Sequence, residues 1–209
     1  ANVNAVDKDG VSVFLAAAKS GKAATVKAML EAGVSFDLDA RDKDGWTALH
    51  CAVRAFGRST DEIIHVLVEA KVDINARDSD GNTALMHATS RGCEDCFHAL
   101  LKYKPDLEIR NNEGMTVIIK STGSKNPKLV NALVKAGADI NAQDAKGMTA
   151  LLWAAHHEDE DMIRTLLDLG ADKDIANHEG QTVLMLAAGT EVEDVINVLL
   201  KPKKIQRRR

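Results

Sequence analysis

The sequence contains several groups of residues whose types and spacing could support chemistry, beginning with a cysteine pair. Cys93 and Cys96 lie three residues apart, with His87 and His98 close by, and all four are zinc-ligand types. A closed structural zinc site needs four ligands, and the sequence offers no second cysteine pair. We therefore interpret Cys93 and Cys96 as structural or inert residues, with a zinc site as the alternative.

A second group is the histidine- and acid-rich run His-His-Glu-Asp-Glu-Asp at residues 156–161. It lacks the His-Glu-x-x-His spacing that places two histidines on one helix face around zinc. Adventitious or functional metal binding is the alternative here, but the sequence predicts no metal site.

Two further patterns are typical of ion or phosphate binding but are incomplete. The Asp-x-Asp-Gly segments at residues 42–45 and 78–81 begin like a calcium loop but lack its downstream bidentate glutamate. Residues 120–125, Lys-Ser-Thr-Gly-Ser-Lys, lack the Gly-Lys-Ser/Thr ending of a phosphate-binding loop. We interpret the first pattern as turns and the second as a helix end with its loop.

Catalytic machinery is not evident in the sequence. No nucleophile and base can be paired into a Ser-His-Asp or Cys-His arrangement. The sequence therefore predicts no catalytic residues, no cofactor and no enzymatic activity.

The polar patterns recur at regular intervals, which changes their interpretation. A glycine closes each polar triplet, and successive glycines are separated by 35, 36, 33, 33 and 33 residues. Serine or threonine follows each glycine by two positions, and a large apolar residue follows it by four. Six aligned copies at this period are typical of a repeat protein. The glycines are Gly10, Gly45, Gly81, Gly114, Gly147 and Gly180.

Each repeat can be translated into local structure. The serine or threonine is expected to cap a short first helix by accepting a backbone N–H hydrogen bond. A second helix follows, with apolar residues such as Val26, Met29 and Leu30 on one face. One unit cannot bury that face alone, whereas stacked units share a continuous core. Such thin layers account for an aromatic content of only 3%.

Two motifs carry a resemblance to a known family. Trp-Thr-Ala-Leu-His-Cys-Ala at residues 46–52 and Ala-Gly-Ala-Asp-Ile-Asn-Ala at residues 136–142 resemble the ankyrin repeat. The resemblance covers residues 1–200 and implies an all-α solenoid of about six helix-turn-helix repeats joined by β-hairpin-like turns. The chain departs from the family pattern because Lys71 and Lys104 replace the glycine at the helix end. The expected repeats are residues 7–40, 42–76, 78–109, 111–142, 144–176 and 177–200, followed by a basic tail at 201–209.

The resemblance implies a protein-protein interaction module that binds another protein or a peptide through a concave groove of turn tips and first helices. Aromatic rings and methionines at such positions are the usual anchors of an interface. Trp153, His156 and His157 share one helix face by their i, i+3, i+4 spacing, and local packing of Trp153 is the alternative. The expected groove residues are Trp46, Arg54, Asn82, Arg91, Met115, Met148, Trp153, His156 and His157.

Two features extend along the expected array. Trp46 lies three repeats from Trp153, or about 30 Å at about 10 Å per helix layer, so the two rings would anchor opposite ends of an extended peptide. Arg41, Arg77 and Arg110 recur just before the turn motif. They form either a basic ladder or solvated turn positions.

Two further roles remain open. The resemblance implies that the hairpin asparagines, Asn75 and Asn141, are candidate substrates of an asparaginyl hydroxylase. The alternative function is that of a regulatory or targeting domain in a larger enzyme, channel or secreted effector. The start of the chain at residues 1–5, which reads as the end of a repeat, motivates that alternative.

Charge and composition bound the partners and the compartment. The net charge is −4, but the tail at 201–209 holds six basic residues, and the rest of the chain carries 21 basic and 31 acidic residues. Such an acidic body argues against nucleic acid binding, and no apolar run approaches the roughly 18 residues of a membrane span. Three cysteines do not form a disulfide framework, which favours a reducing compartment. We expect a cytoplasmic monomer, with the basic tail as a candidate nuclear localisation signal.

Overall fold

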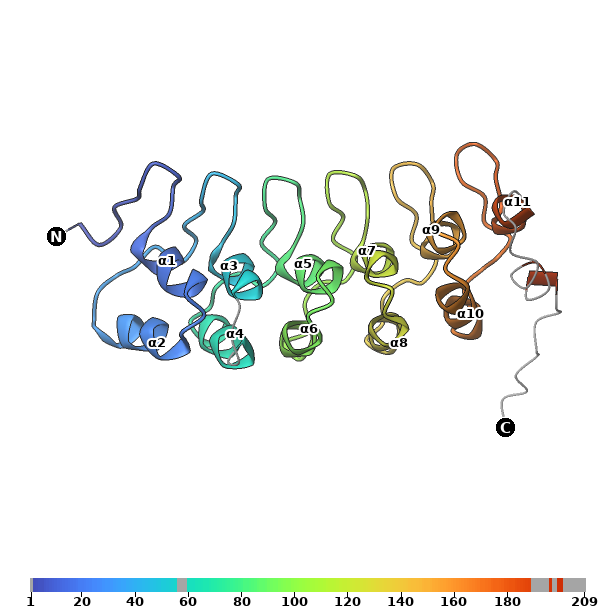
Figure 1. The fold of residues 1–209 in the computed structure, drawn as a ribbon. Coiled ribbons are helices and arrows are strands. Elements are labelled where there is room, and N and C mark those ends of the chain that lie inside the picture. The colour runs from blue at the N-terminus through green and yellow to red at the C-terminus, as the bar shows by residue number, and fades with distance from the viewer. Residues whose placement is uncertain (1, 56–59, 189–195, 197–198, 201–209) are drawn as a thin grey trace.

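The computed structural model describes residues 2–55, 60–188, 196, 199 and 200. Within these residues the chain forms pairs of short helices separated by hairpin-shaped loops (Figure 1). The basic tail at 201–209 and much of the second helix expected in the last repeat lie outside the described residues. The helices are α1 (Val13–Lys19), α2 (Ala23–Glu31), α3 (Ala48–Arg54), α4 (Thr60–Glu69), α5 (Ala84–Ser90), α6 (Glu94–Leu101), α7 (Val117–Ser121), the 3₁₀ helix η1 (Thr122–Ser124), α8 (Pro127–Lys135), α9 (Ala150–His156), α10 (Glu160–Asp168) and α11 (Val183–Ala188).

The helices are arranged in two rows beneath a row of hairpins (Figure 1). The first helices of the repeats form one row, in which α1 packs against α3, α3 against α5, and so on to α11. The second helices form the other row, where α2 packs against α4 and α4 against α6. The predicted all-α ankyrin-type solenoid is therefore confirmed.

The first helices begin where the sequence places a hydroxyl residue. The side chains of Ser12, Thr83 and Thr149 each accept a hydrogen bond from the backbone N–H three residues later, at 3.2, 3.3 and 3.2 Å. This bond satisfies one of the backbone donors that a helix N-terminus leaves without an intrahelical partner. The predicted capping role is confirmed in these repeats, and Thr47 uses a different arrangement that involves a histidine. The prediction is wrong for Thr116, whose side chain makes no capping hydrogen bond.

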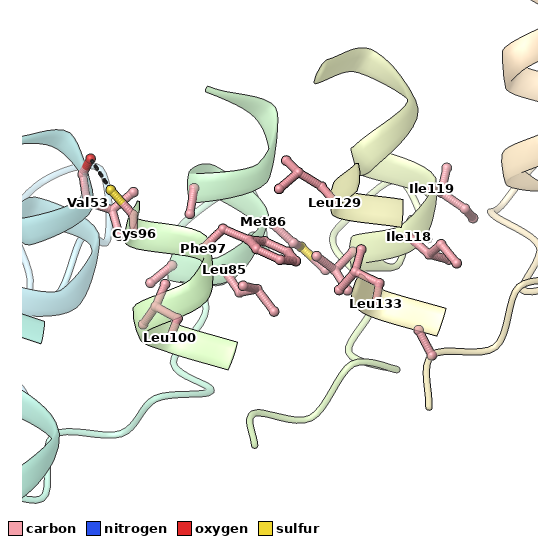
Figure 2. Packing of buried hydrophobic residues seen from close by; sticks show 14 of the residues in the cluster. Val53, Leu85, Met86, Cys96, Phe97, Leu100, Ile118, Ile119, Leu129 and Leu133 are labelled. Atoms are coloured by element: carbon pink, nitrogen blue, oxygen red, sulfur yellow. Dashed lines mark hydrogen bonds between the residues drawn. The ribbon is translucent and has the colours of Figure 1, made fainter. Parts of the chain in front are cut away.

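The core is one continuous cluster that runs along the stack. Large apolar residues of the first helices, such as Leu49, Leu85 and Ile118, are fully buried. The second helices add residues such as Phe97 and Leu133, which Figure 2 shows among the side chains of this cluster. Each layer is only two helices thick, so aliphatic side chains fill it and few aromatic rings are needed.

The polar triplets form the hairpin tips. In each of the six repeats the leading Asp or Asn side chain accepts two backbone N–H hydrogen bonds, from the residues two and four positions later. Asp42, for example, accepts from Asp44 at 3.0 Å and from Trp46 at 2.9 Å. Side chains that accept from their own backbone in this way stabilise tight turns. The interpretation of these triplets as turns is confirmed.

The hairpins are joined to one another as well as to their own helices. The backbone N–H of Ser79 donates to the carbonyl of Asp44 in the preceding hairpin at 3.0 Å, and the same bond recurs at the other hairpin junctions. Gly114 shows how closely the hairpins approach, because a Cβ on it would lie 2.5 Å from the backbone nitrogen of Ala145. Gly114 also has φ +77°, a conformation that favours glycine.

The recurrent arginines reinforce the same junctions. Arg41 donates to the carbonyl of Gly45 in its own hairpin and to the carbonyl of Arg77 in the next. Arg110 donates in the same way to Gly114 and Gln143. These side chains form a ladder, but its function within the fold is to link neighbouring hairpins.

Candidate functional site

The expected groove residues differ in how much of each side chain solvent can reach. Arg54, Arg91, His156 and His157 are exposed, and Trp46, Met115 and Trp153 are half-buried. Asn82 and Met148 are buried, at 9% and 8% exposure. The first seven residues therefore offer side-chain surface to a partner, whereas the last two offer little.

The two buried residues serve the stack. The Asn82 side-chain oxygen accepts from the Asn111 amide of the next repeat at 3.0 Å. The sulfur of Met148 lies 3.5 Å from the amide nitrogen of Asn177, which belongs to the following hairpin. Their sequence positions at the hairpin tips suggested contact with a partner, but neighbouring hairpins cover them instead.

Trp46 is the centre of one aromatic cluster. Its backbone N–H is held by Asp42, and its ring centroid lies 5.0 Å from that of His87 in the next repeat. The Arg54 guanidinium, at the end of α3, lies over the Trp46 ring at 5.0 Å from its centroid. A cation placed over an indole face is attracted by the ring and holds the ring in one orientation.

His50 lies beneath this cluster and is almost completely buried. Its Nδ1 lies 2.8 Å from the Thr47 hydroxyl and accepts from the Thr47 backbone N–H at 3.3 Å. Its Nε2 lies 3.0 Å from the Asn82 carbonyl, which can only accept, so Nε2 carries the proton. Burial lowers the pKa of His50 below its usual value, and this pattern of partners fits the neutral ring.

An ionisable pair that the sequence analysis missed lies beside His50. His87 Nε2 donates to the Asp78 carboxylate at 2.6 Å, and the Asp78 side chain is only 2% exposed. The equivalent carboxylate two repeats later, Asp144, accepts from the indole Nε1 of Trp153 at 2.8 Å. Each partner follows its aspartate by nine residues, so that spacing was the available signal.

Trp153 is the centre of the second aromatic cluster. Its ring stacks on His157 with 5.5 Å between centroids and meets His156 edge-on at 5.7 Å. The shared face of these three residues, expected from their spacing, is confirmed. The bond from Trp153 to Asp144 also shows that part of the indole is engaged locally.

The Asn75 and Asn141 side chains also bridge repeats. The oxygen of Asn75 accepts from the backbone N–H of Asp106 at 3.0 Å, and that of Asn141 accepts from Asp172 at 2.8 Å. Both residues are half-buried. Hydroxylation at these positions stays a prediction, at sites whose oxygen atoms already join neighbouring loops.

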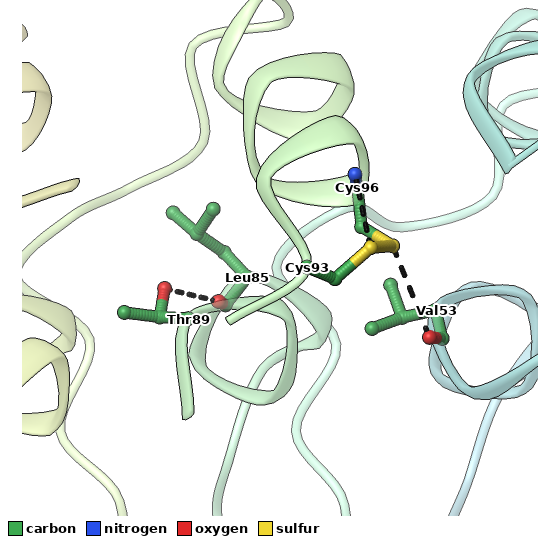
Figure 3. The surroundings of a disulfide bond; sticks show 5 residues. All are labelled: Val53, Leu85, Thr89, Cys93 and Cys96. Atoms are coloured by element: carbon green, nitrogen blue, oxygen red, sulfur yellow. Dashed lines mark hydrogen bonds between the residues drawn. A yellow bond between two sulfur atoms is a disulfide. The ribbon is translucent and has the colours of Figure 1, made fainter. Parts of the chain in front are cut away.

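The structure corrects the interpretation of the cysteine pair. Cys93 and Cys96 form a disulfide at the start of α6, with 5.3 Å between their Cα atoms (Figure 3). Cys93 is the N-cap of α6 and Cys96 lies one turn later, so the helix places both sulfur atoms on the same side. A structural role for this pair was expected, but a disulfide between the two cysteines was not. Cys51 remains free, and burial raises the pKa of its thiol to about 11.

The other chemistry-bearing patterns have structural roles. In the acid-rich run, Asp159 caps α10 by accepting from Met162, and Glu160 pairs with Arg164. Residues 120–125 form the end of α7, η1 and the following turn, as expected for a helix end and loop.

Among the described residues no helix is long and apolar enough to cross a membrane.

Stacked hairpins and helix pairs with this bonding pattern define an ankyrin-type solenoid. The family described as "Ankyrin repeats (3 copies)" matches the chain over residues 1–78, 55–144 and 122–209. The chain therefore belongs to the ankyrin repeat family.

Known relatives and structures agree with this assignment. Ankyrin repeat-containing protein P1E11.10 of Schizosaccharomyces pombe is 42% identical over 69 residues, which is 33% of this chain and 31% of that protein. Human M-phase phosphoprotein 8 is 30% identical over 90 residues, which is 43% of this chain and 10% of that protein. The matches thus span about a third and a tenth of these two relatives.

Two solved structures have the same fold. The ankyrin repeat domain of Bcl-3, a member of the IkappaB protein family, superposes with a TM-score of 0.82 at 26% identity, covering 95% of this chain and 86% of that domain. The ankyrin repeat protein EF0377 superposes with a TM-score of 0.80 at 25% identity, covering 93% and 98%.

Proposed function

We propose that this chain binds another protein or a peptide through the face formed by its hairpins and first helices, without catalysis. Ankyrin repeats in general are protein-protein interaction modules. The observation that carries the proposal is the presence of two ordered aromatic clusters on the first-helix side of the stack. They are Trp46 with Arg54 and His87, and Trp153 with His156 and His157.

Both clusters have the properties of interface anchors. Each combines a half-buried indole with cationic or polarisable neighbours, and the residues that dominate binding energy are enriched in tryptophan and arginine. The ring contacts within each cluster fix the indole before a partner arrives, which reduces the side-chain entropy lost on binding. The two tryptophans at the centres of the clusters belong to repeats two and five, so we infer that an extended partner segment contacts both.

Alanine substitution of each indole tests the proposal. In a capture experiment with the full 209-residue chain, followed by affinity measurement on the captured partner, Trp46→Ala and Trp153→Ala should each weaken binding by about 1–3 kcal/mol. Circular dichroism should show little loss of helix. Met148→Ala is less suitable, because removing a buried methionine side chain itself costs about 2–5 kcal/mol of stability.

Tyr103 provides a matched control. It is a half-buried aromatic residue that stacks on His65, a residue of α4 in the row of second helices. Tyr103→Ala should leave partner binding unchanged. If Tyr103→Ala weakens binding and the two tryptophan substitutions do not, the partner uses the second helices and the proposed face is wrong.

The lengths of the relatives favour a second candidate function. M-phase phosphoprotein 8 contains its matching segment as 10% of its length, so repeats of this kind serve there within a much longer protein. An array of this kind could equally target or regulate a larger enzyme, channel or secreted effector. The full reading frame around the coding sequence distinguishes the two, because this function needs an additional domain in the same chain.

A further inference from the structure

We propose that His50, Asp78 and His87 form a binding site for a divalent transition metal ion, with zinc as the preferred ion. One ligand atom from each residue lies within 4.8 Å of the others. Two imidazole nitrogens and one carboxylate oxygen are a ligand set that zinc uses, with a fourth position left for water or an incoming group. His87 also contacts the Trp46 ring of the proposed partner-binding face, whereas His50 and Asp78 lie beneath that face and are buried.

The distances are close to those of a coordinated ion. Zinc binds nitrogen and oxygen at about 2.0–2.2 Å, which places tetrahedral ligands about 3.3 Å apart. His87 Nε2 and Asp78 Oδ2 are 2.6 Å apart and need to separate slightly, whereas His50 needs to approach them.

The residues behind the ligands would hold them in place. The other carboxylate oxygen of Asp78 accepts from the backbone N–H groups of Asp80 and Asn82, at 3.0 and 2.8 Å. His50 Nδ1 lies 2.8 Å from the Thr47 hydroxyl. Metal-binding histidines and carboxylates are commonly oriented by such outer hydrogen bonds, whose loss weakens metal binding.

Coordination would rearrange the hydrogen bonds of the ligands. Metal binding requires neutral imidazole and ionised carboxylate. If His50 Nε2 binds the ion, its proton moves to Nδ1, where the Thr47 hydroxyl oxygen can accept it in place of the bond that Nδ1 accepts from the Thr47 backbone N–H. The ion would then replace two hydrogen bonds. These are the bond from His50 Nε2 to the Asn82 carbonyl and the bond from His87 Nε2 to Asp78 Oδ2.

The repeats themselves supply a variant that preserves the fold. Asn111 and Asn177 occupy the same position as Asp78 in their repeats, and each accepts the same pair of backbone N–H bonds. Asp78→Asn therefore keeps the turn and removes the carboxylate ligand. Asp144→Asn is the matched control, since Asp144 forms the same turn but pairs with Trp153.

Zinc titration of the full chain, with the Cys93–Cys96 disulfide formed, tests the site. We expect one zinc ion per wild-type chain in competition with a chromogenic chelator, and affinity reduced at least about tenfold in Asp78→Asn but unchanged in Asp144→Asn. Cobalt bound to the wild-type chain should give the absorption bands of a tetrahedral site, and these should be lost in His87→Leu. The substitution is mild, because Leu186 occupies the equivalent position in the last repeat.

Other outcomes overturn the proposal. Equal zinc affinity in Asp78→Asn and Asp144→Asn, or no zinc binding by the wild-type chain, excludes a site at these residues. Loss of binding in a double variant, His156→Ala with His157→Ala, would place the ion on the acid-rich run instead.

Discussion

Asp78 and Asp144 occupy the same position in two repeats, yet their second carboxylate oxygens have different partners. In both residues Oδ1 accepts from the backbone of the turn. The Oδ2 atom accepts from His87 in the case of Asp78 and from the Trp153 indole in the case of Asp144. In these two repeats the turn thus fixes a buried acceptor above the first helix, and the residue nine positions later determines what that acceptor does. This position is where single substitutions can change chemistry without changing the fold.

The buried histidine should make stability depend on pH. Burial lowers the folded-state pKa of His50 below the 6.5 of an unperturbed histidine, so the unfolded chain binds more protons in that range. The contribution of neutral His50 to the free energy of unfolding is therefore fully present above about pH 6.5 and is lost as the pH falls below that value. In urea unfolding with a metal chelator present, the free energy of unfolding should decrease between about pH 7.5 and about pH 5.5.

His50→Gln isolates this contribution. Glutamine at the third helix position can still reach back to the Thr47 backbone N–H, as in a capping box, but it does not titrate. The variant should lose less stability on acidification than the wild type. An identical pH dependence in the two proteins would show that His50 is protonated as easily when folded as when unfolded.

At the scale of the helix, two lysines are held in a conformation that suits glycine. Lys71 and Lys104 follow second helices with φ of 69° and 52°, where Gly33, Gly137 and Gly170 stand in other repeats. For a residue with a Cβ this left-handed geometry costs about 1–2 kcal/mol. Glycine avoids that cost, but its greater freedom in the unfolded chain offsets part of the gain. Lys71→Gly and Lys104→Gly should each raise the unfolding free energy by about 0.5–1 kcal/mol in urea denaturation.

The reverse substitution is the control. Gly137→Lys places lysine at the same helix end, where none of the residues that the structure describes lies within 4 Å of the added Cβ. It should lower stability by a similar amount. If all three substitutions change stability in the same direction, backbone conformation is not the cause.

The sequence predicts the elements well because each repeat carries its own local signals. Hydroxyl caps, the positive φ of the turn glycines and the apolar face of each second helix can be recognised within one repeat, although glycines such as Gly114 also face the next hairpin. Other features depend on distances between repeats or side chains that sequence spacing alone does not determine. These are the hydrogen bond from the Arg41 side chain to the Arg77 carbonyl, the burial of Met148 and the disulfide. The candidate groove stays a prediction, and the packing roles of individual side chains such as Met148 required the structure.

At the scale of the whole molecule, stability is shared between repeats and the junctions that join them. The junctions consist of buried helix contacts, one backbone bond between successive hairpins, and the Arg or Gln side chains that bridge them. A substitution that opens a central junction should uncouple the repeats on its two sides. A substitution at the last repeat should affect that repeat alone.

The same substitution, glycine to alanine, at Gly114 and at Gly180 compares a central junction with the last repeat. Both have positive φ at the same turn position, but a Cβ at Gly114 would clash with the backbone of Ala145, whereas no described residue lies within 4 Å of a Cβ at Gly180. Gly180→Ala should therefore cost about 1–2 kcal/mol, and Gly114→Ala more than about 2 kcal/mol, because the hairpins must move apart. Hydrogen exchange should show reduced protection in α9 and α10 for Gly114→Ala, with α1 to α4 retaining theirs. Equal loss of protection along the whole stack in Gly114→Ala would mean that the array unfolds as one cooperative unit, with no separable halves.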